Sequence, residues 1–253
     1  MLDPLLISLG LLVGTLVGLT GVGGGALLTP LLILVVGVRP VIAVGTDLAF
    51  AAVTKIVGAW QHSRHGTSDK RLVWCLAIGS VPGALLGTHL VSILAATDAT
   101  GKDLLLTHIL GIALLVASGA SLLRATGFSW EGDAKENPRV LVTATLGLGV
   151  GVLVGLTSIG AGSLLMAVFA LFYKRLPAAQ AVGTDVMHGA VLAATAAFAH
   201  GSAGRIELPM LASLLVGSLP GVLLGGWLCS RLPSQPLRVG IAAMLAISGV
   251  RLL

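Results

Sequence analysis

An apolar pattern that is written twice, about half a chain apart, constrains this sequence more than any other feature. Three glycine-containing motifs of the first half recur in the second half at an offset of 137 (155 − 18) or 138 (183 − 45) residues. The pairs are Gly18-Leu19-Thr20 with Gly155-Leu156-Thr157, Gly45-Thr46-Asp47 with Gly183-Thr184-Asp185, and Gly79–Gly87 with Gly217–Gly225. Long apolar segments built on an internal duplication are typical of secondary transporters.

The composition predicts an all-α polytopic membrane protein. Hydrophobic residues make up 56% of the 253 residues, charged residues only 10%, and the mean hydropathy is +1.02. Runs such as Leu72–Leu94, Leu104–Leu123 and Leu208–Leu228 have the ~20 residues that a helix needs to cross a lipid bilayer. The net charge of +5 comes from loop lysines and arginines, so it reports membrane orientation and predicts no nucleic-acid partner.

The duplication divides the chain into a first repeat over 1–123, a connector loop over 124–139 and a second repeat over 140–253. Each repeat contains four apolar stretches, of which the first is long and broken by glycine and the other three are expected to be transmembrane helices. The stretches cover 4–37, 40–62, 71–94 and 104–123 in the first repeat, and 140–173, 177–200, 206–229 and 236–253 in the second.

The first stretch of each repeat should break in its middle. Gly21-Val22-Gly23-Gly24-Gly25 interrupts one and Ser158-Ile159-Gly160-Ala161-Gly162 the other, and each glycine costs a helix ~1 kcal/mol relative to alanine. Non-helical backbone at membrane depth must be covered by protein or a wet cavity, so the two breaks should face each other or a substrate. Loop charge favours a hairpin-like stretch, with both termini outside and the two repeats inverted.

Such a break is a predicted anion site. The second half-helix presents its unpaired N–H groups and positive dipole end to the membrane interior, and glycine lets a small oxyanion approach the backbone. Thr29 and Ser163 add hydroxyl groups nearby. The candidate substrate-binding residues are Thr20, Gly23, Gly24, Gly25, Thr46, Thr157, Ser158, Gly160, Gly162 and Thr184. The alternative is that the glycines only let helices pack closely, which is the favoured reading for Gly79–Gly87 and Gly217–Gly225.

Four ionisable residues inside the apolar stretches are candidates for ion coupling. Asp47 and Asp185 each lie ~10 Å inside a predicted helix, where a carboxylate is costly and a functional role is the default expectation. A structural capping role is the alternative. Because two carboxylates would repel an anion, we expect protonation, a bound cation or the lysine Lys55 to compensate them. Lys55 could instead snorkel to the interface, whereas His188 shares a helix face with Asp185 and could relay a proton.

These motifs together resemble the TauE/SafE family, also called the sulfite exporter or 4-toluene sulfonate uptake permease family. The resemblance rests on Gly18-Leu19-Thr20-Gly21-Val22-Gly23-Gly24-Gly25, on Gly45-Thr46 leading to Trp60-Gln61-His62, on Gly79-Ser80-x-Pro82-Gly83, and on their echoes in the second half. It implies a multi-pass permease of the bacterial cytoplasmic membrane that moves sulfite, sulfoacetate, other organosulfonates or thiosulfate without ATP hydrolysis. Asp47 and Asp185 depart from the family pattern, in which serine more often follows Gly-Thr.

The leading hypothesis is therefore a secondary transporter of small sulfur oxyanions or sulfonates, with the proton as the expected coupling ion. A transporter that uses Asp47 and Asp185 to bind a cation, or to couple to one, is an alternative, and an anion channel is another. An intramembrane enzyme based on Asp185 and His188 would need one specialised half, so we expect no catalytic residue. We also expect no cofactor and no metal site, because no histidine or cysteine cluster has the spacing of one. The oligomeric state is left open, with a homodimer as one candidate.

Overall fold

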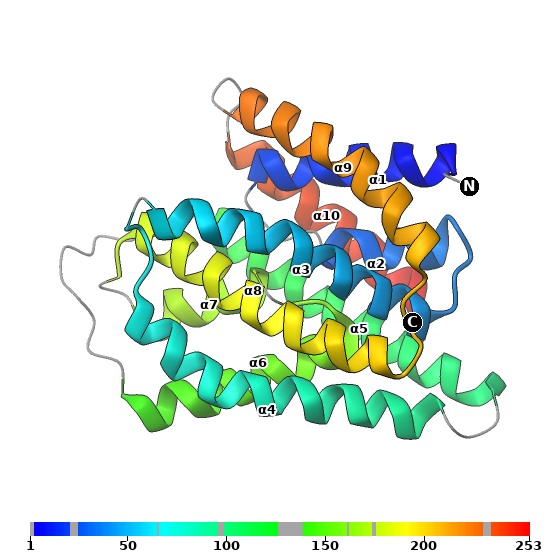
Figure 1. Cartoon of the computed structure of the whole chain (residues 1–253), viewed down its shortest axis with the longest axis horizontal. Coiled ribbons are helices and arrows are strands. Elements are labelled where there is room, and N and C mark those ends of the chain that lie inside the picture. Colours follow the sequence, from blue (N-terminus) through cyan, green and yellow to red (C-terminus); the bar gives the residue numbers. More distant parts are fainter. Residues whose placement is uncertain are drawn as a thin grey trace.

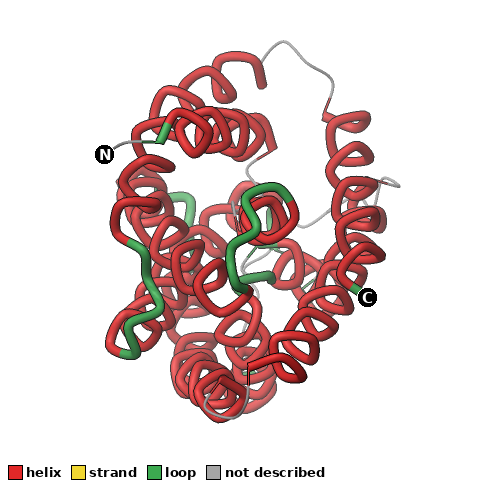
Figure 2. The backbone as a smooth tube through the Cα atoms, turned by 90° about the vertical axis from the view of Figure 1, so that its right-hand side faces the viewer, coloured by secondary structure: helices red, strands yellow, loops and turns green. Residues whose placement is uncertain are grey.

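A computed structural model describes residues 3–20, 25–64, 66–95, 99–125, 139–160, 162–173, 176–229 and 234–253. Within those ranges the chain forms α-helices and loops, with no strand (Figures 1 and 2). The helices are α1 (Pro4–Thr20), α2 (Gly25–Leu34), α3 (Pro40–Arg64), α4 (Lys70–Ala95), α5 (Ala99–Ala125), α6 (Val140–Thr157), α7 (Ser163–Phe172), α8 (Ala178–Ser202), α9 (Leu208–Cys229) and α10 (Ser234–Leu252).

Helices α3, α4, α5, α6, α8 and α9 are long and apolar enough to cross a membrane. The outer surface agrees with that assignment, because large apolar side chains are exposed along it, among them Trp74, Leu141, Phe198 and Leu223. Polar side chains, in contrast, gather inside, where Thr29, Asp47, Asp185, His188 and His200 are all buried. This inside-out distribution is that of a multi-pass membrane protein, as predicted.

The predicted break of the second repeat is confirmed, and that of the first repeat is bounded by two described helices. Helix α1 ends at Thr20 and α2 begins at Gly25, while α6 ends at Thr157 and α7 begins at Ser163. Helices α2 and α7 have ten residues each, a length of ~15 Å that is half of the hydrocarbon core. Residues 21–24 lie outside the described ranges, so the first break is described from its two flanks alone.

The two halves of the chain exchange helices. Helix α1 packs along α9, and α6 packs along α4, so the first helix of each half lies on a long helix of the other half. Helix α3 packs on α8, and α5 packs on α10. Figure 1 shows the α1/α9 pair above and the α4/α6 pair below, with α3 and α8 side by side between them. The halves therefore interlock and do not form two separate bodies.

Rows of glycine allow the α4/α6 and α1/α9 pairs to approach closely. A β-carbon at Gly79 would lie 1.8 Å from the carbonyl oxygen of Ala144, and one at Gly151 would lie 2.2 Å from that of Ser80. No side chain fits at such distances. The residues that share this property are Gly79, Gly83 and Gly87 on α4, Gly147, Gly151 and Gly155 on α6, Gly10 and Gly14 on α1, and Gly217, Gly221 and Gly225 on α9. The packing interpretation of the two repeated glycine groups is thus confirmed.

Candidate functional site

Asp47 lies at the centre of a buried polar cluster where the two halves meet. Its carboxylate accepts a hydrogen bond from the Thr29 hydroxyl of α2 through the atoms Oγ1 and Oδ2. Ser158, from the second break, lies beside the same carboxylate. Asp47 and Thr29 are fully buried, and Ser158 is 4% exposed. The cluster joins the consecutive helices α2 and α3 of the first half to the end of α6 in the second half.

The two breaks touch each other at this cluster. Gly25, the first residue of α2, packs so closely on the second break that a β-carbon there would lie 2.5 Å from the carbonyl oxygen of Ser158 and 3.0 Å from its hydroxyl oxygen. The expectation that the breaks face one another is confirmed for these flanking residues. Glycine is required at position 25 because of this close approach.

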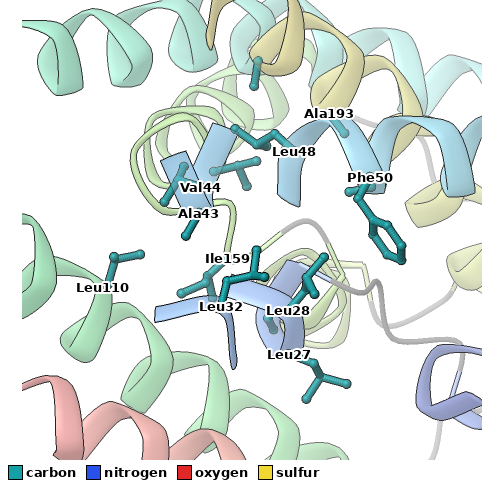
Figure 3. Close-up of a cluster of buried hydrophobic side chains, with 14 of the residues drawn as sticks. Leu27, Leu28, Leu32, Ala43, Val44, Leu48, Phe50, Leu110, Ile159 and Ala193 are labelled. Atoms are coloured by element: carbon teal, nitrogen blue, oxygen red, sulfur yellow. The ribbon is translucent and has the colours of Figure 1, made fainter. Parts of the chain in front are cut away.

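Buried apolar side chains from the same three segments pack against one another. Figure 3 shows Leu28 and Leu32 of α2 beside Ile159 of the second break, with Val44 and Leu48 of α3 on the other side. All five are at most 1% exposed. In such a low-dielectric environment a charge or hydrogen bond has a larger effect than it has in water. A buried anion or an uncompensated carboxylate would therefore interact strongly with its neighbours here.

The second break leaves a polar group that has no partner. Gly162 precedes α7 without a side-chain cap for the first turn of that helix. The hydroxyl group of Ser163 is buried and makes no hydrogen bond among the described residues, whereas the Ser158 hydroxyl has the Asp47 carboxylate beside it. Buried polar atoms are nearly always paired, so such an exception calls for a ligand, a water or an ion. The Ser163 hydroxyl as a donor and the positive end of α7 suit an anion.

Backbone conformation at the second break depends on glycine. Ser158 is in the left-handed region with a φ of 60°, and Gly160 and Gly162 have φ values of 123° and 146°. Thr157 supports the turn, since its hydroxyl oxygen accepts a hydrogen bond from the Ile159 N–H at 3.1 Å. The break is therefore a defined structure and not merely a frayed helix end.

Gly160→Ala should destabilise the protein by about 1–3 kcal/mol, because alanine is strained at this φ and its methyl group would lie 2.7 Å from a Leu164 methyl carbon. The melting temperature of the purified protein measures the effect. Gly119→Ala on α5, where nothing lies within 4 Å of the added carbon, is the matched control. Equal melting temperatures for the two variants would show that the break does not depend on its glycine.

A second cluster forms on α8. Asp185, His188 and Gly189 are spaced by three and four residues and so share one helix face. The Lys55 ammonium of α3 lies against that face, 2.3 Å from the place where a Gly189 β-carbon would be. His188 Nε2 lies 2.8 Å from the Ser80 hydroxyl of α4. Since Lys55 is only 7% exposed, its side chain points into the protein, and the snorkelling alternative is wrong.

Two predicted substrate-binding residues have backbone partners instead. Thr46 accepts a hydrogen bond from the N–H of Glu207 at 3.2 Å, and Thr184 accepts one from the N–H of Asp69 at 3.0 Å. The other predicted residues that the structure describes, Gly25, Thr157, Ser158, Gly160 and Gly162, lie at the breaks. Gly23, Gly24 and the Thr20 side chain lie outside what the structure describes.

Comparison with known proteins decides the family. The family model described as "Sulfite exporter TauE/SafE" matches residues 6–252. The chain belongs to the TauE/SafE family. No solved structure shows a significant match to it.

Relatives of this TauE/SafE chain carry transporter names. The "Probable membrane transporter protein YjnA" of Bacillus subtilis strain 168 is 40% identical over 254 residues, which cover 98% of each chain. The "Probable membrane transporter protein YdhB" of the same organism is 28% identical, with 98% of this chain and 99% of the relative covered. The "Probable membrane transporter protein MJ0441" of Methanocaldococcus jannaschii is 23% identical, with 100% and 96% covered. The similarity therefore spans whole chains.

The sequence did not predict that Ser80 belongs to the polar interior of this TauE/SafE protein. Ser80 belongs to a motif interpreted only as helix packing, yet its hydroxyl contacts His188. The signal was present in the duplication, because Ser218 occupies the matching position in the second half. A hydroxyl retained in both copies of a glycine row could have been assigned to the polar interior.

Proposed function

We propose that this TauE/SafE protein is a secondary active transporter that moves small sulfur-containing anions across the cytoplasmic membrane. The substrate class comprises sulfite, thiosulfate, sulfoacetate and other organosulfonates, and the proton is the coupling ion. The observation that carries this proposal is the second break, where Ser158 lies beside Asp47 and α7 begins at Ser163, whose buried hydroxyl has no hydrogen-bond partner among the described residues. The name of the matched family supports the sulfur oxyanion as substrate.

Inverted repeats over 1–123 and 140–253 fit this function. The reciprocal packing of α1 on α9 and of α6 on α4 supports two equivalent halves that can rock against each other. Substrate and ion sites at the meeting point of broken helices are the usual arrangement in transporters of this type. The anion would bind between the breaks and be exposed to one side of the membrane at a time.

Asp47 couples the anion to the proton in this proposal. An ionised carboxylate at the cluster repels an anion, whereas a protonated one does not and can donate a hydrogen bond to it. Binding of the anion therefore favours uptake of a proton at Asp47. Asp185 with His188 and Lys55 forms the corresponding cluster on α8, where the Lys55 ammonium supplies a positive charge.

Ser163→Ala tests the anion site directly. The variant removes a buried hydroxyl without a hydrogen-bond partner, so the ligand-free protein should be equally stable or more stable than wild type by up to about 1 kcal/mol. Binding should weaken, because the anion loses a donor. The measurement is the melting temperature with and without sulfite, thiosulfate or sulfoacetate, since a ligand of the folded state raises it. We expect one of these anions to stabilise the wild type and to stabilise the variant less.

Ser121→Ala is the matched control, because the Ser121 hydroxyl is buried on α5 and bonds the Ala117 carbonyl of its own helix at 2.8 Å. It should leave the anion effect unchanged. If no sulfur anion stabilises the wild type while Na⁺ does, the cation-transporter alternative replaces the proposal. A channel would instead carry the anion without any dependence on a pH gradient.

A further inference from the structure

Two short loops each dock on a helix of the opposite half. The loop that precedes α9 reaches α3, where a β-carbon at Gly45 would lie 2.2 Å from the carbonyl oxygen of Arg205. The loop that precedes α4 reaches α8, where a β-carbon at Gly183 would lie 2.1 Å from the carbonyl oxygen of Thr67. Glycine on the helix therefore makes room for the loop backbone in both places.

A buried threonine fixes each loop. The Thr46 hydroxyl oxygen accepts the Glu207 N–H at 3.2 Å, and the Thr184 hydroxyl oxygen accepts the Asp69 N–H at 3.0 Å. Both threonines are 0% exposed, although the donors belong to loops. The next residue in each helix is a cluster aspartate, Asp47 or Asp185. Each loop is thus bonded to the helical turn that carries one of the two carboxylates.

The two docking points lie at opposite ends of the molecule. In Figure 1 the connection between α8 and α9 is at the right-hand end of the long axis, and the connection between α3 and α4 is at the left-hand end. A transporter with a central site has to close it from either side, and these two loops lie at the two ends of the helices that carry Asp47 and Asp185.

The two loops are not held equally. Arg205, in the loop before α9, also donates to the Ser92 hydroxyl at 2.7 Å and to the Thr88 carbonyl at 3.4 Å, both on α4. Thr67, at the matching position in the other loop, contacts His62 Nδ1 of α3 at 2.8 Å, and α3 and Thr67 belong to the same half. The loop before α9 therefore has additional bonds to the opposite half.

We propose that Thr46 and Thr184 are positioning residues that hold these two loops as alternating gates, and that neither contacts the substrate. The inference rests on the proposed transport function and replaces the substrate-binding role predicted for the two threonines. Release of the loop from Thr46 opens the path at one end, and release from Thr184 opens it at the other. In an alternating-access cycle the site opens to one side while it is closed to the other, so release of one loop goes with docking of the other.

A disulfide across one gate tests the coupling between them. Thr46→Cys with Glu207→Cys, in a Cys75→Ser and Cys229→Ser background, links the two residues that the 3.2 Å hydrogen bond joins by a disulfide that dithiothreitol reverses. Amide hydrogen exchange then reports on the far gate through the Asp69 N–H. Asp69 itself is left intact, because its carboxylate accepts the Leu72 N–H at the start of α4.

In the oxidised protein we expect the Asp69 amide to exchange about threefold faster or more, because locking one gate shifts the population toward opening of the other. Dithiothreitol should reverse the change, and the single variant Thr46→Cys should not show it. Unchanged or slower exchange at Asp69 in the oxidised protein would overturn the proposal. This measurement needs no substrate, so its result does not depend on whether the substrate is a sulfur-containing anion.

Transport in proteoliposomes gives the second readout, with thiosulfate and sulfite as probes. The oxidised protein should lose transport by about tenfold or more and recover on reduction, while the anion still raises its melting temperature. Should the disulfide form poorly, Thr46→Val should accelerate exchange of the Glu207 amide and Thr46→Ser should restore it. If the fully oxidised protein transports the probes as fast as the protein treated with dithiothreitol, the gate proposal is overturned. If the wild type transports neither probe, only the substrate class is overturned.

Discussion

Asp47→Asn should abolish transport driven by a pH gradient while leaving the protein folded. Asparagine has nearly the same shape as the carboxylate and can still accept the Thr29 hydrogen bond, but it cannot take up or release a proton. Uptake driven by the pH gradient should therefore fall to the level of empty liposomes. The anion should still bind, since the charge that repels it is gone. The measurement is thiosulfate or sulfite uptake into proteoliposomes with an imposed pH gradient, alongside the anion-induced shift in melting temperature.

The internal duplication supplies the matched variant for this prediction. Asp185→Asn removes the other buried carboxylate, which lies on the α8 face that Lys55 contacts at Gly189. Removal of this negative charge leaves the Lys55 ammonium with less opposite charge nearby. We therefore expect a lower free energy of unfolding than in Asp47→Asn, together with slower transport. If the Asp47→Asn variant still accumulates the anion in response to the pH gradient, a group other than Asp47 carries the proton.

Gly151→Leu should destabilise the protein more than any other single change named above. The β-carbon alone would lie 2.2 Å from the Ser80 carbonyl oxygen and 2.8 Å from the Ser80 Cα atom, so α6 and α4 would have to separate. Overpacking of this kind costs about 3 kcal/mol or more, and it also displaces the serine that contacts His188. A large loss in melting temperature, or failure to purify a folded protein in detergent, is the expected result.

Gly149→Leu is the control for that substitution, because Gly149 is on the same helix and nothing lies within 4 Å of its missing β-carbon. An apolar side chain there faces the exterior, so the free energy of unfolding should change by less than about 0.5 kcal/mol. Similar losses at positions 149 and 151 would mean that helix propensity, and not the contact with α4, sets the stability of α6.

Local sequence signals predicted the helices and their breaks well. Glycine clusters and apolar length are properties of one segment, so the ends of α1 and α6 and the starts of α2 and α7 could be located from them. The choice of packing partner could not. The four-residue spacing of Gly79, Gly83 and Gly87 indicates a close helix neighbour, but nothing in it selects α6 over the other helices.

The site was predicted in part for the same reason. Asp47 and Ser158 were expected from a charge at depth and from a break, both of which are local features. Thr46 is also a candidate substrate-binding residue, but its hydrogen-bond partner, a backbone N–H 161 residues away, could not be predicted from its neighbours in the sequence. Likewise, Lys55 points inward because Gly189 leaves space on α8, and a missing side chain on a distant helix leaves no mark near residue 55.

The exchange of helices between the halves has a consequence for each half on its own. A half-length protein ending near residue 123 would contain the glycine row of α4 without α6, and that of α1 without α9. The glycine rows of α1 and α4 would then face lipid and would lose their close contacts with the backbones of α9 and α6. A second half-length chain could supply both missing partners, so either half of this chain should need a partner subunit in order to fold.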